Sequence, residues 1–300
     1  MSLSDRIWDY DKLCSRFTCE RPSKLISTHQ IEEKLWQKLQ VATAIYMSRC
    51  LPSDEVILDE EALLDMFEQN QASIRNITPN GLIVPKKHTI LEYNTLIRTF
   101  AEVIDSLKIE DLILSWHIPP SLRIKFGEAN KANLARSHPT ESIHADSWVG
   151  ESPDSVTVHI PIFGDLNRNY VAFYEPPEDF QENWLKPLQS YADGAEIAAK
   201  YTKLDFAPGQ RQLILADFAS LHMTTRLPRA GSRVSIDTNF HLKRQNDGNK
   251  RKTGYNWQEN ERASHNVLMG LGQTHLLFFP DDVNQMVLHQ SGSNLKVLEF

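Results

Sequence analysis

The chain has 300 residues, of which 41% are hydrophobic and 24% charged, as expected for a globular protein that can bury a substantial core. Its formal net charge of −7 argues against nucleic acid or an anionic membrane as the main partner, because both attract proteins with a basic excess. The charged N-terminus and the lack of an apolar run approaching ~18 residues lead us to expect neither a secretory signal nor a membrane span.

The cysteines are few and lie close to the N-terminus, at Cys14, Cys19 and Cys50. A sparse, odd-numbered set without Cys-x-x-Cys spacing is typical of a reducing compartment and predicts no structural zinc site. We therefore expect a cytoplasmic protein.

In chain order, the N-terminal third shows helical periodicity. Helices are predicted at Ser27–Cys50, with Thr28 as the cap, at Asp59–Gln71 and at His88–Leu107, since apolar residues recur there every three or four positions. Residues 1–118 are therefore predicted to form a helical layer.

After Pro119-Pro120 the apolar period changes to two, which is typical of half-buried strands. The predicted strands are Leu122–Phe126, Val156–Phe163, Asn167–Tyr174, Gln212–Phe218 and Arg233–Leu242. A charged, partly helical insertion is expected at 176–203, and a helix at Glu259–Met269. Short strands without alternating helices predict an α+β fold with a mainly β core, an antiparallel barrel or jelly roll, over residues 119–243. Residues 244–300 would be a C-terminal extension of the same folding unit.

One short segment carries a candidate metal pair. His144 and Asp146 are two residues apart, and in a strand such residues project from the same face. The pair by itself is more typical of an ordinary structural role than of a metal site. His222 is the candidate that would complete the site, with His241 as its competitor. Two imidazoles and one carboxylate suit ferrous iron in oxygenases, because open positions remain on the ion for a co-substrate and dioxygen.

The strand predicted at Arg233–Leu242 has one polar and one apolar face. Its polar face carries Arg233, Ser235, Asp237, Asn239 and His241. This face is either a solvated edge or part of the mouth of a barrel. An arginine with a neighbouring hydroxyl can bind a carboxylate through charge-assisted hydrogen bonds.

On these residues the sequence resembles a known family. His144-Ala-Asp146, Pro208-Gly209 with the strand 212–218, His222, and Arg233-Val-Ser235 match the ordered pattern of the non-haem Fe(II)/2-oxoglutarate-dependent oxygenases, which are double-stranded β-helix (jelly-roll) proteins. The spacing is most similar to that of the phytanoyl-CoA hydroxylase-like branch, which includes bacterial small-molecule tailoring enzymes. The resemblance covers residues 120–243 and leaves the helical N-terminal third and the tail unexplained.

The resemblance implies that Fe(II) is bound by His144, Asp146 and His222, and that 2-oxoglutarate chelates the iron. The far carboxylate of 2-oxoglutarate would be bound by Arg233, assisted by Ser235. Dioxygen and 2-oxoglutarate would then oxidise a small metabolite, with succinate and CO2 as co-products. Related halogenases replace the carboxylate ligand by a small residue, so Asp146 favours hydroxylation or a related oxidation.

Other residues are weaker candidates. Trp148, Asn239 and Arg123 are predicted to contact the substrate. Arg123 and Lys125 would contact an acidic substrate or co-substrate, or lie on a solvated strand face, and His159 would point into the barrel or pack.

Two other classes of function remain open on the sequence alone. A cupin-like metal enzyme would use the same ligands without 2-oxoglutarate. A non-enzymatic jelly-roll binding module would bind no metal and would use the polar strand face as a ligand platform.

Overall fold

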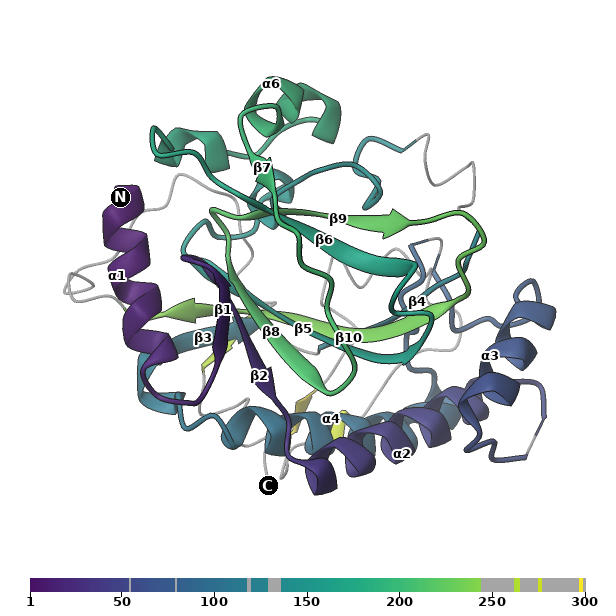
Figure 1. The fold of residues 1–300 in the computed structure, drawn as a ribbon. Coiled ribbons are helices and arrows are strands. Elements are labelled where there is room, and N and C mark those ends of the chain that lie inside the picture. Colours follow the sequence, from purple (N-terminus) through teal and green to yellow (C-terminus); the bar gives the residue numbers. More distant parts are fainter. Residues whose placement is uncertain are drawn as a thin grey trace.

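The computed structural model of the chain describes residues 1–53, 55–78, 80–117, 120–128, 136–243, 262–264, 275–276 and 297–298. Two antiparallel sheets lie at the centre of the fold, and helices cover the outer face of the larger sheet (Figure 1). The protein is therefore a mixed helix-and-sheet protein with a mainly antiparallel core. Among the helices described, none is long and apolar enough to span a lipid bilayer.

The larger sheet has the strand order β1-β2-β8-β5-β10-β3-β11, and β4 also pairs with β10. Its strands are β1 Glu20–Ser23, β2 Ile26–Gln30, β3 Ile113–His117, β4 Ser121–Lys125, β5 Ser155–Gly164, β8 Gln212–Asp217, β10 Arg233–Leu242 and β11 Arg262–Ser264. A separate short pair is formed by β12 His275–Leu276 and β13 Val297–Leu298.

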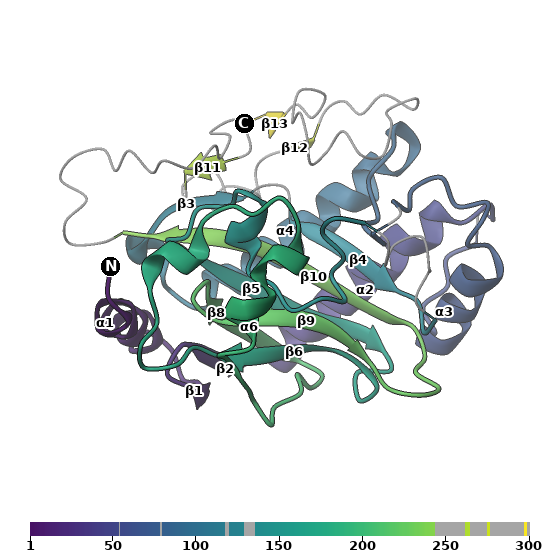
Figure 2. The ribbon, with the colours of Figure 1, turned by 90° about the horizontal axis from the view of Figure 1, so that it is seen from above.

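The smaller sheet has the order β7-β6-β9. It consists of β6 Asn169–Glu175, β7 Thr202–Lys203 and β9 Leu221–Arg226. Figure 1 and Figure 2 show β6 and β9 lying across from β8, β5 and β10. Side chains on the facing surfaces of the two sheets therefore point into a common interior.

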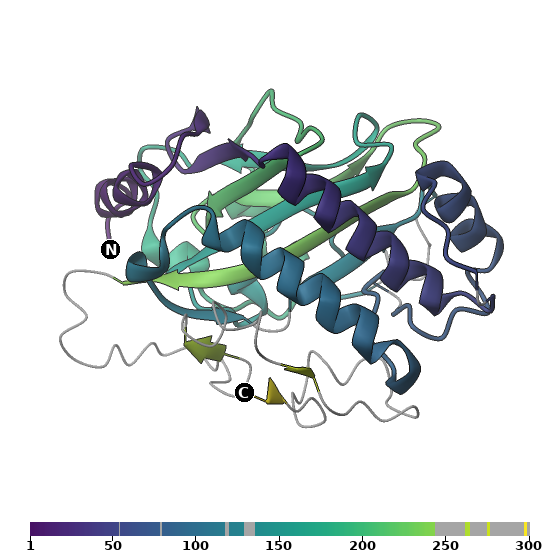
Figure 3. The same ribbon diagram turned by 90° about the horizontal axis from the view of Figure 1, so that it is seen from below.

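Helices α2 (Glu33–Cys50) and α4 (Ile90–Asp105) run side by side along the outer face of the larger sheet (Figure 3). The other helical segments are α1 Leu3–Cys14, α3 Glu60–Gln69, α6 Ala195–Ala198 and the short 3-10 helices Lys87–Thr89, Glu110–Leu112, Asp146–Val149, Glu182–Leu185 and Tyr191–Gly194. The last two of these 3-10 helices and α6 confirm the partly helical insertion predicted at 176–203.

The two faces of β5 and β10 have different surroundings. One face carries buried apolar side chains, such as Val158 and Ile236, in the same core cluster as α2 and α4 side chains such as Leu39 and Phe100. Because side chains alternate along a strand, the polar residues of β10 lie on the opposite face, toward the smaller sheet. Arg233 and Ser235 are only 3% and 1% exposed, so the polar face lines the interior and is not a solvated edge.

Helix α1 was not predicted, and a buried arginine ties it to the sheets. Its start is closed by a capping box between Ser2 and Asp5. Arg6 is fully buried, and its guanidinium donates to Asp217 at 2.8 Å and to Glu182 at 2.9 Å. Charge-assisted bonds to two carboxylates offset the cost of burying this cation.

The predicted helix over residues 27–50 begins later than expected. Strand β2 occupies Ile26–Gln30, and α2 starts at Glu33. Thr28 is not a helix cap but pairs with Ile214 of β8 and is buried. The local pattern could not reveal this pairing, because the partner strand lies far along the chain.

The N-terminal third is consequently not a purely helical layer. Strands β1, β2 and β3 belong to the same sheet as β5, β8 and β10, so that sheet extends across the boundary predicted between residues 118 and 119. The helix predicted at Glu259–Met269 is wrong at Arg262–Ser264, which form strand β11, and the rest of that prediction lies outside the described residues.

The five strands predicted beyond residue 119 are all present, with shifts of a few residues at their ends. Strand β9 was missed. Its sequence, Leu221-His-Met-Thr-Thr-Arg226, has the burial pattern of an irregular strand in which only Leu221 and Thr224 are buried. Such a segment lacks the regular alternation by which strands are recognised.

Candidate metal and anion site

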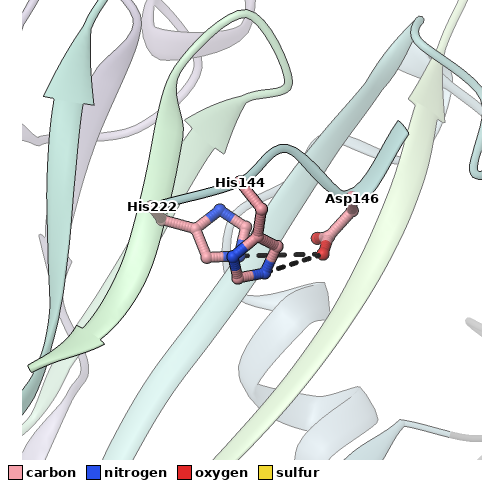
Figure 4. Close-up of side chains that lie close together, drawn as sticks. All are labelled: His144, Asp146 and His222. Atoms are coloured by element: carbon pink, nitrogen blue, oxygen red, sulfur yellow. Dashed lines mark ion pairs between the residues drawn. The ribbon is translucent and has the colours of Figure 1, made fainter. Parts of the chain in front are cut away.

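Three side chains form a group with the geometry of a metal site. His144, Asp146 and His222 each offer one ligand atom, and these atoms all lie within 4.8 Å of one another. Figure 4 shows both imidazoles turned toward the carboxylate of Asp146, whose Oδ1 is 3.9 Å from Nε2 of His144 and 3.7 Å from Nε2 of His222. The structure thus brings together the three residues predicted as metal ligands.

His144 and Asp146 are not positioned by the single strand that the sequence predicted. His144 forms an isolated antiparallel bridge with His222 of β9, with backbone hydrogen bonds of 3.0 and 2.9 Å in the two directions. Asp146 begins a short 3-10 helix that closes at Gly150, whose φ of 98° favours glycine. The carboxylate is therefore aimed by a tight turn, and the expectation that both residues lie on one strand is wrong.

The hydrogen bonding of His144 fixes its tautomer. Nδ1 lies 2.7 Å from the carbonyl oxygen of Ser142, which can only accept, so Nδ1 carries the proton. Nε2 is left with a free lone pair on the side facing Asp146. Burial and the neighbouring His222 lower the pKa of His144 to about 3, although Asp146 opposes the shift. His144 is thus held in the neutral form that a metal ion requires.

Two further side chains orient the group, and neither was among the predicted site residues. Thr157 of β5 has its hydroxyl 3.5 Å from Oδ2 of Asp146, the oxygen that does not face the imidazoles. Tyr191, in the 176–203 insertion, stacks on His144 with ring centroids 4.2 Å apart and planes 19° apart. The charged composition of the insertion gave no signal that it would supply an aromatic wall to this site.

Arg233 is a buried cation that contacts a histidine and forms no ion pair with an acid within the described residues. Its Nη1 lies 3.5 Å from Nε2 of His159, and its Nε makes no hydrogen bond within the described parts of the chain. Burial lowers the pKa of Arg233 to about 10, with Asp237 opposing the shift and Arg226 and Arg123 adding to it. A guanidinium in such surroundings is prepared to bind an anion.

His159 is a neighbour of Arg233 in the interior. It is fully buried, and burial is the largest cause that lowers its pKa well below the ordinary value, followed by the charges of Arg233 and His222. Neutral His159 can accept a hydrogen bond from Arg233. The sequence analysis left open whether this histidine packs or points inward, and these neighbours show that it points inward.

The other predicted site residues lie around the same interior. Ser235 pairs in register with Arg123 of β4, and Arg123 donates from Nε to Asp237 at 3.2 Å. Asn239 is the cross-strand partner of Thr157, so it lies near the Asp146 carboxylate. The solvated strand face considered for Arg123 is wrong, because its side chain is only 20% exposed.

Trp148 is placed differently from the prediction. Its side chain is fully buried, and its indole Nε1 donates to the carbonyl of Trp184 at 2.8 Å. The ring packs beside Tyr191 and leaves no room for a side chain at Gly194. Trp148 has no exposed surface and packs against Tyr191, and its contact with a substrate stays a prediction.

Lys125 is a buried amine on the interior face of β4. Its Nζ donates to Thr140 at 2.6 Å and lies 3.8 Å from Oε1 of Glu141. Burial lowers the pKa of Lys125 to about 7, and Arg123, Arg226 and Arg233 lower it further, whereas Glu141 opposes the shift.

This shift predicts a pH dependence of stability. Between about pH 7 and pH 10.5 the unfolded chain binds a proton on Lys125 that the folded chain has released. The free energy of unfolding should therefore rise with pH in this window, by up to about 1.4 kcal/mol per pH unit from this group. Lys125→Met should lose this contribution. Urea unfolding of metal-free wild type and Lys125→Met at several pH values would measure the difference in this pH dependence. If the free energy of unfolding changed with pH in the same way in both proteins, the lowered pKa of Lys125 would be contradicted.

No protein-family model matches the sequence, and no curated protein matches it either. Solved structures do show overall similarity. The α-ketoglutarate-dependent epimerase SnoN from nogalamycin biosynthesis has a TM-score of 0.41 at 9% identity, over 83% of this chain and 90% of that chain.

Two other solved structures each have a TM-score of 0.36. An N-substituted L-amino acid dioxygenase from Burkholderia ambifaria AMMD, in complex with α-ketoglutarate, is 12% identical over 79% of this chain and 90% of its own. AviO1 from Streptomyces viridochromogenes Tue57 is 11% identical over 77% of this chain and 94% of its own.

Proposed function

We propose that the protein is an Fe(II)- and 2-oxoglutarate-dependent oxygenase with a double-stranded β-helix core, and that it hydroxylates a small molecule. The observation that carries this proposal is the convergence of two groups in one interior. A His-Asp-His cluster presents three ligand atoms, and the buried guanidinium of Arg233 has a donor, Nε, with no hydrogen-bond partner in the part of the chain that the structure describes.

The donor set fits iron. His144 is neutral, with Nε2 free to bind, and His222 and Asp146 present an imidazole nitrogen and a carboxylate oxygen beside it. Two histidines and one carboxylate leave positions on a six-coordinate ferrous ion for other ligands. The hydrogen bond that His144 donates to the Ser142 carbonyl and the contact of the Thr157 hydroxyl with Asp146 orient the two side chains, as outer partners do in metal sites.

The interior also fits a dicarboxylate co-substrate. Arg233 would bind the far carboxylate with its forked donors, and Ser235, on the same strand face, would add a hydroxyl. Burial of Arg233 excludes water from this end, so the charge-assisted bonds would be stronger than on a surface.

When bound, iron with 2-oxoglutarate supplies the means by which dioxygen oxidises a C–H bond, with succinate and CO2 as co-products. The residues of this chain bind and orient the participants. Asp146 would bind the iron through its carboxylate, and a halide would then lack that position, which favours insertion of oxygen.

The test is anaerobic titration of the purified protein with Fe(II) and then with 2-oxoglutarate, followed by the absorbance of the iron chelate. We expect one iron per chain and a chelate band that saturates with one equivalent of 2-oxoglutarate. Iron binding without the band would favour a metal enzyme that needs no 2-oxoglutarate. Absence of iron binding would favour a ligand-binding protein.

A further inference from the structure

A cluster of buried charges lies next to the metal group, outside the residues so far given a role. Glu141 is at its centre, with a side chain only 15% exposed. Nη1 of Arg226 donates to Oε1 of Glu141 at 2.9 Å, and Nζ of Lys125 lies 3.8 Å from the same oxygen. Although burial opposes it, these two cations lower the pKa of Glu141 below its ordinary value.

The three charged residues come from three separate parts of the chain. Lys125 ends β4, Arg226 ends β9, and Glu141 lies in the irregular segment that leads to His144 and Asp146. Arg226 also donates from Nε to the carbonyl of Phe126, just after β4, at 2.8 Å. The cluster therefore fastens this segment to two strands at once.

The segment has no regular secondary structure of its own, so side chains and single backbone bonds hold it in place. Residues 136–145 form neither a helix nor a strand, and their backbone meets β9 at two points. These are the bridge between His144 and His222 and the 2.7 Å bond from the Thr224 amide to the Thr140 carbonyl. Glu141 lies three residues before His144, and its partner Arg226 lies four residues after His222. The ion pair thus closes the same junction that the metal ligands bridge.

We propose that Glu141 is a positioning residue of the metal site, which holds the segment carrying His144 and Asp146 against the strand carrying His222. This inference rests on the metal site of the proposed function. It assigns no contact between Glu141 and the ion. Without the carboxylate, Arg226 would lose the ion pair that ties the segment to the end of β9, and the segment would move away from β9.

Glu141→Gln keeps the shape of the side chain and removes its charge. We expect Ni²⁺ affinity, measured by calorimetry, to fall about 10- to 100-fold, the range typical of lost outer partners in metal sites. The matched control is Glu182→Gln, because Glu182 also accepts from a buried arginine, Arg6, at 2.9 Å, but in another part of the fold. That variant should bind Ni²⁺ as wild type does.

Urea unfolding of the metal-free forms separates positioning from general destabilisation. If both variants lost affinity in proportion to their lost stability, the role of Glu141 would be purely structural and the proposal overturned. Arg226→Gln removes the partner of Glu141 on β9 and should weaken Ni²⁺ binding by a similar factor. This variant provides the test if Glu141→Gln does not fold. The double variant should bind no more weakly than the weaker single variant, because the pair acts as a unit. Wild-type affinity in either single variant would refute the proposal, whereas a wild-type protein that binds no Ni²⁺ would refute the metal site itself.

Discussion

Asp146→Ala and His222→Ala should each reduce metal affinity by at least about a hundred-fold, more than the 10- to 100-fold loss that follows removal of an outer partner. Each substitution removes one of three ligand atoms that lie within 4.8 Å of one another. Both side chains are partly exposed, at 24% and 19%, so neither truncation leaves a large cavity. The fold should persist, and circular dichroism with metal analysis of the purified variants would measure both properties.

Two histidines serve as controls for this experiment. His29 is remote from the site, with its ring bonded to the Thr18 carbonyl, and His29→Ala should bind metal normally. His241→Ala tests the competing distal ligand, and because the clustered group contains His222 instead, we expect this variant to retain metal. Stoichiometric iron in both Asp146→Ala and His222→Ala would show that the cluster is not the metal site.

The sequence predicted which three residues cluster but not how the fold orients them. The short spacing of His144 and Asp146 is visible in any linear reading, and His222 follows a strand that its apolar alternation predicts correctly. The 3-10 turn at Asp146 and the bridge between His144 and His222 depend on backbone bonds between distant segments. Long-range pairing of this kind leaves no periodic signal, which is also why β2 and β9 were missed.

Burial shows which way the polar face of β10 points, which its alternating sequence could not. A strand with one polar face is compatible with solvent or with a lined interior, and the sequence offered no means to choose. The structure covers that face with β6 and β9, so Arg233 and Ser235 are almost fully buried. Tyr191 could not be found by sequence because only the folded insertion brings its ring to His144. The same insertion covers Trp148, which lies close to His144 and Asp146 in the sequence and was predicted to contact the substrate.

Arg233→Ala should leave metal binding intact and raise the 2-oxoglutarate requirement by at least about two orders of magnitude. Arg233 is 3% exposed, its Nε has no hydrogen-bond partner within the described residues, and its cross-strand neighbour is another cation, Lys125. A carboxylate bound there would be the anionic partner that this guanidinium lacks. Losing one member of a buried charged pair costs roughly 3–5 kcal/mol, which is about a hundred-fold to several thousand-fold in affinity.

The titration of 2-oxoglutarate, followed by the iron chelate band under nitrogen, should compare wild type with three variants. Arg233→Lys should recover only part of the affinity, because a point charge does not reproduce the fork of donors. Arg16→Ala, which removes an arginine that is 40% exposed and paired with Asp111 far from the site, should behave as wild type. Unchanged 2-oxoglutarate binding in Arg233→Ala would show that another interior cation binds the far carboxylate. Arg123 and Lys125 of β4 would be the next residues to test, because they pair with Ser235 and Arg233 of β10.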